Sequence, residues 1–206
     1  MNPFLDDWLE RQSSSELKSK RRCLKFLKTA YAACVSDFAN KPRTDVTMTE
    51  GGFRFHVGTP LPDLRQIASW MLTHAPRKRT LAKVVPALWK RHGREDVSIA
   101  GILLANLEPS TLGQDPWMAF IHLLQRQEPL LVVLEVAEEL VRAGHAVPDN
   151  AWLEAAAEQS PHWHQYCVLF LSLKREDIGC RALIEQAPKG GEMFERIRSR
   201  LLESES

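Results

Sequence analysis

The stretch Gly58-Thr59-Pro60-Leu61-Pro62-Asp63-Leu64-Arg65-Gln66-Ile67-Ala68 opens the region that decides the fold. It reads as a turn followed by the start of a helix, because apolar residues return to helical spacing after Pro62. Two more helical patterns follow, one containing Ala87-Leu88-Trp89 and one that begins after Gly93. Residues 55–107 therefore predict three amphipathic helices joined by short breaks.

Most of the remainder of the 206-residue chain also shows amphipathic helical patterns separated by short breaks. We expect about nine or ten helices with short loops and no alternation of strands and helices. Antiparallel neighbours of this kind stack most naturally as a right-handed α-solenoid of HEAT-like helical repeats. The prediction is an all-α fold in one domain spanning residues 1–206.

Residues 44–58 interrupt the helical period. Phe53-Arg54-Phe55-His56-Val57 alternates apolar and polar residues, Val46 and Met48 do so more weakly, and Glu50-Gly51-Gly52 separates the two runs. The pattern fits a short hairpin or an irregular connecting loop.

Composition places the chain among ordinary soluble proteins, with 44% hydrophobic and 26% charged residues. A formal net charge of +1 gives no global attraction to nucleic acid or to an anionic membrane, so such binding needs a local patch. The longest apolar run, residues 130–134, is far shorter than the roughly 20 residues that span a bilayer. No membrane partner is expected.

Cysteine spacing indicates reduced thiols. The four cysteines lie far apart and form no Cys-x-x-Cys pair, which argues against a zinc site or a disulfide framework; they are Cys23, Cys34, Cys167 and Cys180. The first seven residues lack the basic and apolar regions of a signal peptide. A cytoplasmic location is the expectation.

Three features of residues 55–107 stand in a recognisable order: Gly58-x-Pro60-x-Pro62-x-Leu64-Arg65-x-Ile67-Ala68, then Leu88-Trp89, then Glu95-x-x-x-x-Ala100-x-x-Leu103. This order resembles the DNA alkylation repair family of HEAT-like helical-repeat proteins, the AlkD type. The resemblance implies a curved solenoid that binds duplex DNA. It also implies a DNA glycosylase activity that releases N3- or N7-alkylated purines without a cofactor or a metal. A carboxylate and aromatic faces beside the deoxyribose suit that reaction.

The residues that the resemblance implies for catalysis are mostly replaced. The family carries a carboxylate four residues after a tryptophan, whereas Trp117 is followed by Met118-Ala119-Phe120-Ile121. Asp115 is the nearby carboxylate and hence the catalytic candidate, although its place before Pro116 is also explained by helix capping.

A second family signature, Trp-x-Arg-Arg, corresponds to Trp163-His164-Gln165-Tyr166, and a C-terminal aromatic position falls on Leu201 when Phe194 is aligned. Both arginines and the aromatic residue are therefore missing. Trp117 and Trp163 are candidates to face DNA, but tryptophans at helical spacing among apolar neighbours are more often core residues.

Basic residues give the clearer signal for DNA. The candidates occupy turns and ends of the predicted helices, where the rim of a solenoid could meet phosphates; they are Arg77, Lys78, Arg79, Lys90, Arg91 and Arg94, with Lys83 nearby. A solvated helix surface is the equally weighted alternative. The densest basic cluster lies earlier, within residues 18–28.

No metal site is expected. His162 and His164 flank Trp163, but residues two apart on a helix point in nearly opposite directions.

Two functions remain open. The first is a DNA alkylation repair-like protein that binds duplex DNA and excises or senses alkylated purines. The second is a non-catalytic helical-repeat scaffold for a protein partner. A monomer is expected in either case.

Overall fold

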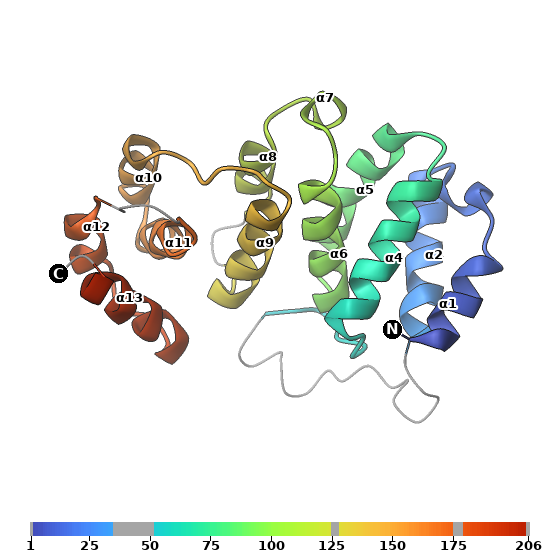
Figure 1. The fold of residues 1–206 in the computed structure, drawn as a ribbon, viewed down its shortest axis with the longest axis horizontal. Coiled ribbons are helices and arrows are strands. Elements are labelled where there is room, and N and C mark those ends of the chain that lie inside the picture. The colour runs from blue at the N-terminus through green and yellow to red at the C-terminus, as the bar shows by residue number, and fades with distance from the viewer. Residues whose placement is uncertain (1, 35–51, 125–127, 175–178, 205–206) are drawn as a thin grey trace. The chain divides into compact units, whose positions relative to one another are not determined.

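The computed structural model describes residues 2–34, 52–124, 128–174 and 179–204, and regular structure in these ranges is helical (Figure 1). One isolated bridge is the only β-type pairing there, so the all-α prediction is confirmed. No helix in these ranges has both the length and the apolar character that a bilayer span needs.

The chain divides into two compact units, Met1–Leu123 and Leu124–Ser206, and each has its own buried core. Each unit is described below by itself. That both belong to one repeat domain over residues 1–206 stays a prediction.

Successive helices of the first unit alternate between two layers (Figure 1). One layer holds α1 (Pro3–Glu10), α4 (Leu61–His74) and α6 (Arg94–Ala105). The other holds α2 (Lys20–Ala33), preceded by η1 (Ser14–Leu17), and α5 (Lys78–Arg91). The unit ends with α7 (Pro109–Leu112) and α8 (Pro116–Leu123). The three helices predicted for residues 55–107 are α4, α5 and α6.

α6 is the central helix of this unit. Every residue from Glu95 to Ala105 is buried, and the helix packs on α4, α5 and α8. A helix that is apolar on all sides stays in solution only when neighbours surround it. Its polar residues Glu95 and Asp96 lie in the first turn, where the helix dipole favours carboxylates.

Residues 53–59, which we call the strap, lie against the start of α6. The amide of Arg54 donates to the carbonyl of His92 at 2.9 Å, and the amide of Arg94 donates to the carbonyl of Phe55 at 3.0 Å. These bonds form the isolated parallel bridge between Phe55 and Gly93. The predicted hairpin partner, within residues 44–51, lies outside the described residues.

The carboxylate of Glu95 holds the second half of the strap. Its Oε1 accepts hydrogen bonds from the amides of Val57, Gly58 and Thr59 at 3.1, 2.9 and 3.3 Å. Nε2 of His56 lies 3.5 Å from the same oxygen. Three amides on one buried oxygen supply most of the hydrogen bonding that water would otherwise give it.

The second unit is arranged around α11 (Pro161–Leu171), whose residues 165–171 are all buried. α11 packs on α9 (Leu130–Arg142), α10 (Asn150–Ala157), α12 (Arg181–Gln186) and α13 (Glu192–Ser204). The phenol of Tyr166 accepts from the amide of Glu128 at 2.7 Å, so the chain two residues before α9 is fixed to the centre of the unit.

The close approach of the strap to α6 gives a first prediction. A Cβ added at Gly93 would lie 2.0 Å from the ring of Phe55, although the backbone φ of −79° suits any residue. We therefore expect Gly93→Ala to displace the Phe55 ring and to lower the free energy of unfolding by about 1–3 kcal/mol. Urea denaturation measures the effect.

Because the conflict is between two side chains, Phe55→Leu in the Gly93→Ala background should recover part of the loss. Equal losses in the single and double variants would show that the Phe55 ring is not the source of the strain.

Candidate nucleic-acid interface

α2 and α5 carry the same pattern in the same register. Lys20-Arg21 of α2 corresponds to Lys78-Arg79 of α5, and Lys25 corresponds to Lys83. The buried positions coincide as well: Cys23, Phe26, Leu27, Ala30 and Tyr31 match Leu81, Val84, Val85, Leu88 and Trp89. The two helices, which contact one another, therefore present equivalent faces.

The two helices also run in the same direction. The phenol of Tyr31, near the end of α2, donates to Oδ1 of Asp96 at 3.0 Å. Arg91, the last residue of α5, donates to both oxygens of the same carboxylate through Nε and Nη2. One side chain at the start of α6 thus joins the C-terminal ends of α2 and α5.

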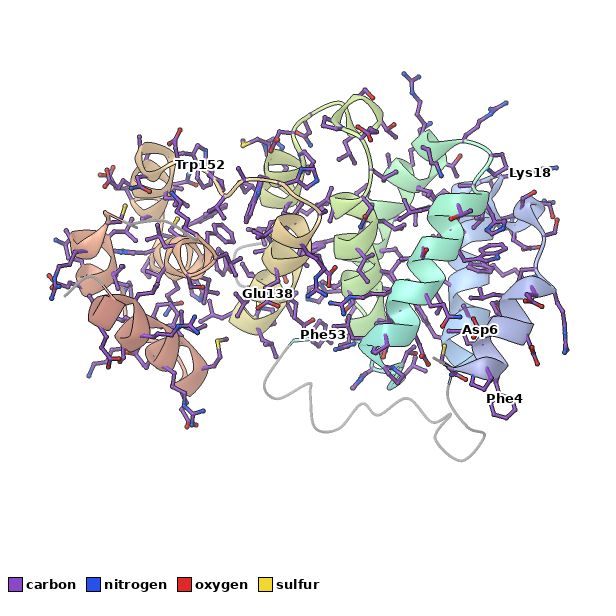
Figure 2. The ribbon with its side chains drawn as sticks, in the orientation of Figure 1. Phe4, Asp6, Lys18, Phe53, Glu138 and Trp152 are labelled. Atoms are coloured by element: carbon purple, nitrogen blue, oxygen red, sulfur yellow. The ribbon has the colours of Figure 1, made fainter. Side chains whose placement is uncertain are left out.

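Opposite the buried stripes, α2 and α5 expose a row of cations each. We call these residues the basic face: Arg21, Lys25, Lys28, Arg79, Lys83 and Lys90, all of them exposed. Neither helix contains an aspartate or a glutamate. Lys18, just before α2, is exposed too (Figure 2). A cluster of one sign on a chain of net charge +1 is the local patch that anion binding requires.

The dimensions of the basic face suit a polyanion. From Arg79 to Lys90 the row extends about 16 Å along α5, at 1.5 Å per residue. Packed helices lie about 8–10 Å apart, which sets the separation of the two rows. Duplex DNA carries about one negative charge per 1.7 Å of its axis, so several phosphates fit opposite such a face.

Sequence reasoning identified only part of the basic face. Arg79 and Lys90 belong to it, while Arg77 and Lys78 are exposed at the start of α5. It did not assign Arg21, Lys25 and Lys28 to a binding site, although it noted their cluster. The repeated register of residues 20–33 and 78–91 is the signal that would have found them.

Arg91 and Arg94 differ from the other predicted cations. The Arg91 side chain is 32% exposed and its guanidinium is bonded to the fully buried carboxylate of Asp96. Arg94 is half-buried as the first residue of α6, and its amide is bonded to the strap. Arg91 therefore has a structural role in addition to its positive charge.

Burial sets the ionisation of this cluster. It raises the pKa of Asp96 above the ordinary value, while the bonds from Arg91 and Tyr31 oppose that rise. The bond to Asp96 raises the pKa of Arg91. Burial, followed by the charge of Asp96, raises the pKa of Tyr31 well above its usual range. At neutral pH, Arg91 is the cation that compensates a buried aspartate, and Tyr31 remains a hydrogen-bond donor.

A second prediction concerns this ion pair. Arg91→Ala leaves Asp96 buried without its cation, and we expect a loss of about 3–5 kcal/mol in the free energy of unfolding at neutral pH. The variant also raises the pKa of Asp96 further, because Arg91 no longer lowers it.

Since a raised carboxyl pKa favours the protonated folded state, stability is lost as pH rises through the folded-state pKa. The deficit of Arg91→Ala relative to wild type should therefore be smaller at pH 4.5 than at pH 7 in urea denaturation. Lys90→Ala, on the exposed side of the same turn, is the matched control and should change stability little. A deficit that is the same at both pH values would contradict the role assigned to Asp96.

The predicted catalytic residue Asp115 caps α8. Its Oδ1 accepts from the amides of Trp117 at 2.8 Å and Met118 at 3.3 Å, which is the capping alternative that the sequence left open. The Trp117 side chain is 3% exposed, and its ring packs 6.2 Å from that of Phe120. Trp117 therefore lies in the core and does not present its ring to a ligand beside Asp115.

Trp163 lies in the second unit, at the start of α11. Its ring makes edge contacts with Trp152 at 6.3 Å and Tyr166 at 5.7 Å, and it is half-buried. The neighbouring His164 has Nε2 2.7 Å from the carbonyl of Leu183. The described part of the chain holds no group of His, Cys, Asp and Glu that could bind a metal ion.

The cysteines are free thiols, and three of them have raised pKa values. Burial raises the pKa of Cys23 to about 11 and that of Cys167 to about 12. Burial, followed by Asp63, raises the pKa of Cys34 to about 12. A thiolate nucleophile at neutral pH is not available from these three residues.

Comparisons of the chain with protein-family models, with curated proteins and with solved structures found no match.

Proposed function

We propose that the chain binds duplex DNA through the basic face of α2 and α5. The observation that supports this most directly is the pair of side-by-side helices that contain no acidic residue and contribute the six exposed cations of the basic face. Neutralising phosphates with Lys and Arg releases the counterions of DNA, which is the main source of sequence-independent affinity.

The composition of the two helices favours a duplex over a single strand. Their aromatic residues Phe26, Tyr31 and Trp89 are buried, so the basic face offers no aromatic surface on which unpaired bases could stack. α2 and α5 also lack Asn and Gln, the residues that most often read adenine. Phosphate contacts are therefore the expected main source of affinity.

The proposal includes the right-handed α-solenoid of HEAT-like repeats. Support comes from the two alternating layers in residues 2–34 and 52–123 and from the matched register of α2 and α5, as successive repeats would give. The free thiols are compatible with the proposed cytoplasmic location.

For alkylated purines we propose recognition without excision. The resemblance suggests the lesion class, whereas the nearest carboxylate, Asp115, is used to cap α8. A glycosylase of this type needs a carboxylate beside the sugar to stabilise the charge that develops there.

The third prediction tests the basic face. Removing Lys25 and Lys83 together, as alanines, should lower duplex affinity, and the slope of log K against log salt should become shallower by about 2, since each phosphate contact contributes about 0.9. Fluorescence anisotropy with a labelled duplex at several salt concentrations measures both quantities.

Lys189→Ala, an exposed lysine of the second unit, is the matched control and should leave both quantities unchanged. Wild-type protein whose duplex binding is undetectable or independent of salt would refute the proposed function.

The fourth prediction concerns catalysis. On a duplex that contains 7-methylguanine we expect binding and no released base, scored in the same samples. If free base does appear, Asp115→Asn decides the residue: an unchanged rate removes Asp115 as the stabilising carboxylate, and a large loss restores it. Asparagine is as good a helix cap as aspartate, so the variant should fold.

A helical-repeat scaffold for a protein partner remains the second candidate function. It is favoured by a groove in the other layer of the first unit, which has the opposite charge.

A further inference from the structure

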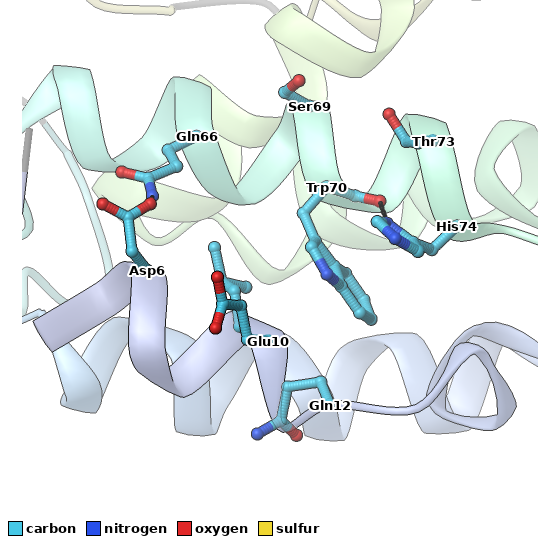
Figure 3. A pocket seen from close by; sticks show the side chains of 9 residues that line it. Asp6, Glu10, Gln12, Gln66, Ser69, Trp70, Thr73 and His74 are labelled. Atoms are coloured by element: carbon cyan, nitrogen blue, oxygen red, sulfur yellow. Dashed lines mark hydrogen bonds between the residues drawn. The ribbon is translucent and has the colours of Figure 1, made fainter. Parts of the chain in front are cut away.

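A groove of about 560 Å³ lies between α1 and α4, on the layer that does not carry the basic face (Figure 3). From α1 and the residues after it come Asp6, Leu9, Glu10 and Gln12, and from α4 come Gln66, Ser69, Trp70, Thr73 and His74. Figure 3 shows Trp70 extending from α4 toward α1, with Glu10 opposite. The groove opens to solvent at the exposed residues Glu10, Ser69 and Thr73.

One wall of the groove is the end of an aromatic column. The rings of Trp8 and Phe26 lie 5.4 Å apart, those of Phe26 and Trp70 stack at 5.0 Å, and those of Trp70 and His74 stack at 4.6 Å. Phe26 is buried, whereas His74 is exposed. The column therefore holds the indole of Trp70 rigidly and ends in a flat imidazole at the surface.

Hydrogen bonds inside the groove leave mainly acceptors unbonded. The amide nitrogen of Gln66 donates to Asp6, and that of Gln12 donates to the carbonyl of Trp8 at 2.9 Å. Nδ1 of His74 lies 2.9 Å from the carbonyl of Trp70, which can only accept, so Nδ1 carries the proton. In the neutral imidazole, Nε2 then keeps its lone pair.

The charge of the groove is negative. Asp6 and Glu10 line it, and no Lys or Arg does among the described residues. α1 contains three acidic residues, the third being Asp7, and no basic residue. Phosphates are therefore repelled here, and the groove cannot be an extension of the basic face.

We propose that this groove binds an arginine side chain of a partner protein. A guanidinium has five N–H donors and no acceptor, which complements carboxylates, amide oxygens and an imidazole lone pair. Its planar, weakly hydrated cation stacks on aromatic rings, whereas an ammonium is a compact, strongly hydrated charge. The exposed imidazole of His74, which ends the column, offers such a ring face, so the groove favours guanidinium over ammonium.

The indole N–H of Trp70 indicates that the arginine comes from a protein. It carries no hydrogen bond within the described residues, and Trp70 is half-buried on the groove wall. A peptide supplies a matching acceptor, a backbone carbonyl next to the arginine, whereas a simple guanidinium ion such as N-methylguanidinium has none. An open groove between two helices also admits an extended segment.

The test uses an octapeptide of alternating glycine and arginine, acetylated and amidated, with matched lysine and citrulline peptides. Indole N–H signals of ¹⁵N-labelled protein report each of the six tryptophans, and Trp70→Phe assigns the signal of Trp70. The arginine peptide should shift the signal of Trp70 and leave that of Trp152, in the second unit, unchanged. The lysine and citrulline peptides should bind at least tenfold more weakly.

Variants locate the site without disturbing the core. Glu10→Gln should weaken the arginine peptide about tenfold, through loss of a charge-assisted hydrogen bond. Thr73→Lys places a cation in the groove and should abolish binding; both side chains are exposed, so folding is preserved. Glu138→Gln, an exposed acid of α9 (Figure 2), is the control and should have no effect.

Three outcomes overturn the proposal: no shift at Trp70, equal affinity for the lysine peptide, or binding of N-methylguanidinium as tight as that of the arginine peptide, which would indicate a small-molecule site. The proposal does not depend on DNA binding. Protein with alanine at Lys25 and Lys83 should bind the peptide normally, and Glu10→Gln should bind duplex DNA normally, so either proposal can fail alone.

Discussion

The first unit depends on one buried carboxylate. Asp96 accepts from Tyr31 at the end of α2 and from Arg91 at the end of α5, and it lies in the first turn of α6. A charge without solvent is stable only when oriented donors replace its water. The direction of three helices is therefore fixed at one point. This constraint keeps the exposed rows of α2 and α5 in register, on which the proposed phosphate contacts rely.

The repeated helix pattern separates charge between the layers. α2 and α5 bury one apolar stripe each and leave all remaining positions free to carry cations. α1 has the opposite composition, with Asp6, Asp7 and Glu10. The net charge of the whole chain hides this arrangement because the second unit is acidic: residues 124–206 contain 14 Asp and Glu against 9 Lys and Arg. Two proposed surfaces of opposite preference, one for phosphates and one for guanidinium, follow from the same two-layer packing.

Helical spacing was sufficient to predict the class of the fold and the helices between residues 60 and 105. Apolar residues that recur every three or four positions form one face of a helix, and that face is buried against a neighbouring element. The position of the strap could not be predicted. Its alternation fitted a hairpin or an irregular loop and gave no sign that Phe55 pairs with Gly93. That pairing depends on a glycine almost 40 residues away making room for a ring.

The site was harder to predict than the fold. Position along the chain does not distinguish Lys90, which is exposed, from Arg91, which is paired with a buried acid. Similarly, the sequence left Trp117 as a candidate to face DNA beside the more common core position, and its burial shows that it lies in the core. The groove was missed because its two walls, Asp6 and Glu10 on one side and Trp70 and His74 on the other, are separated by about 60 positions and share no motif.

Unequal charge on the two layers gives the first unit a permanent electric dipole directed from the α1 side to the α2–α5 side. In the field of a polyanion such a body experiences a torque before any contact is made. Random collisions would then be converted into approaches with the cationic layer leading, which raises the association rate at low ionic strength. The layer of α1 and α4, which carries the groove, would then face away from the polyanion. The groove would stay open to solvent while the basic face is occupied.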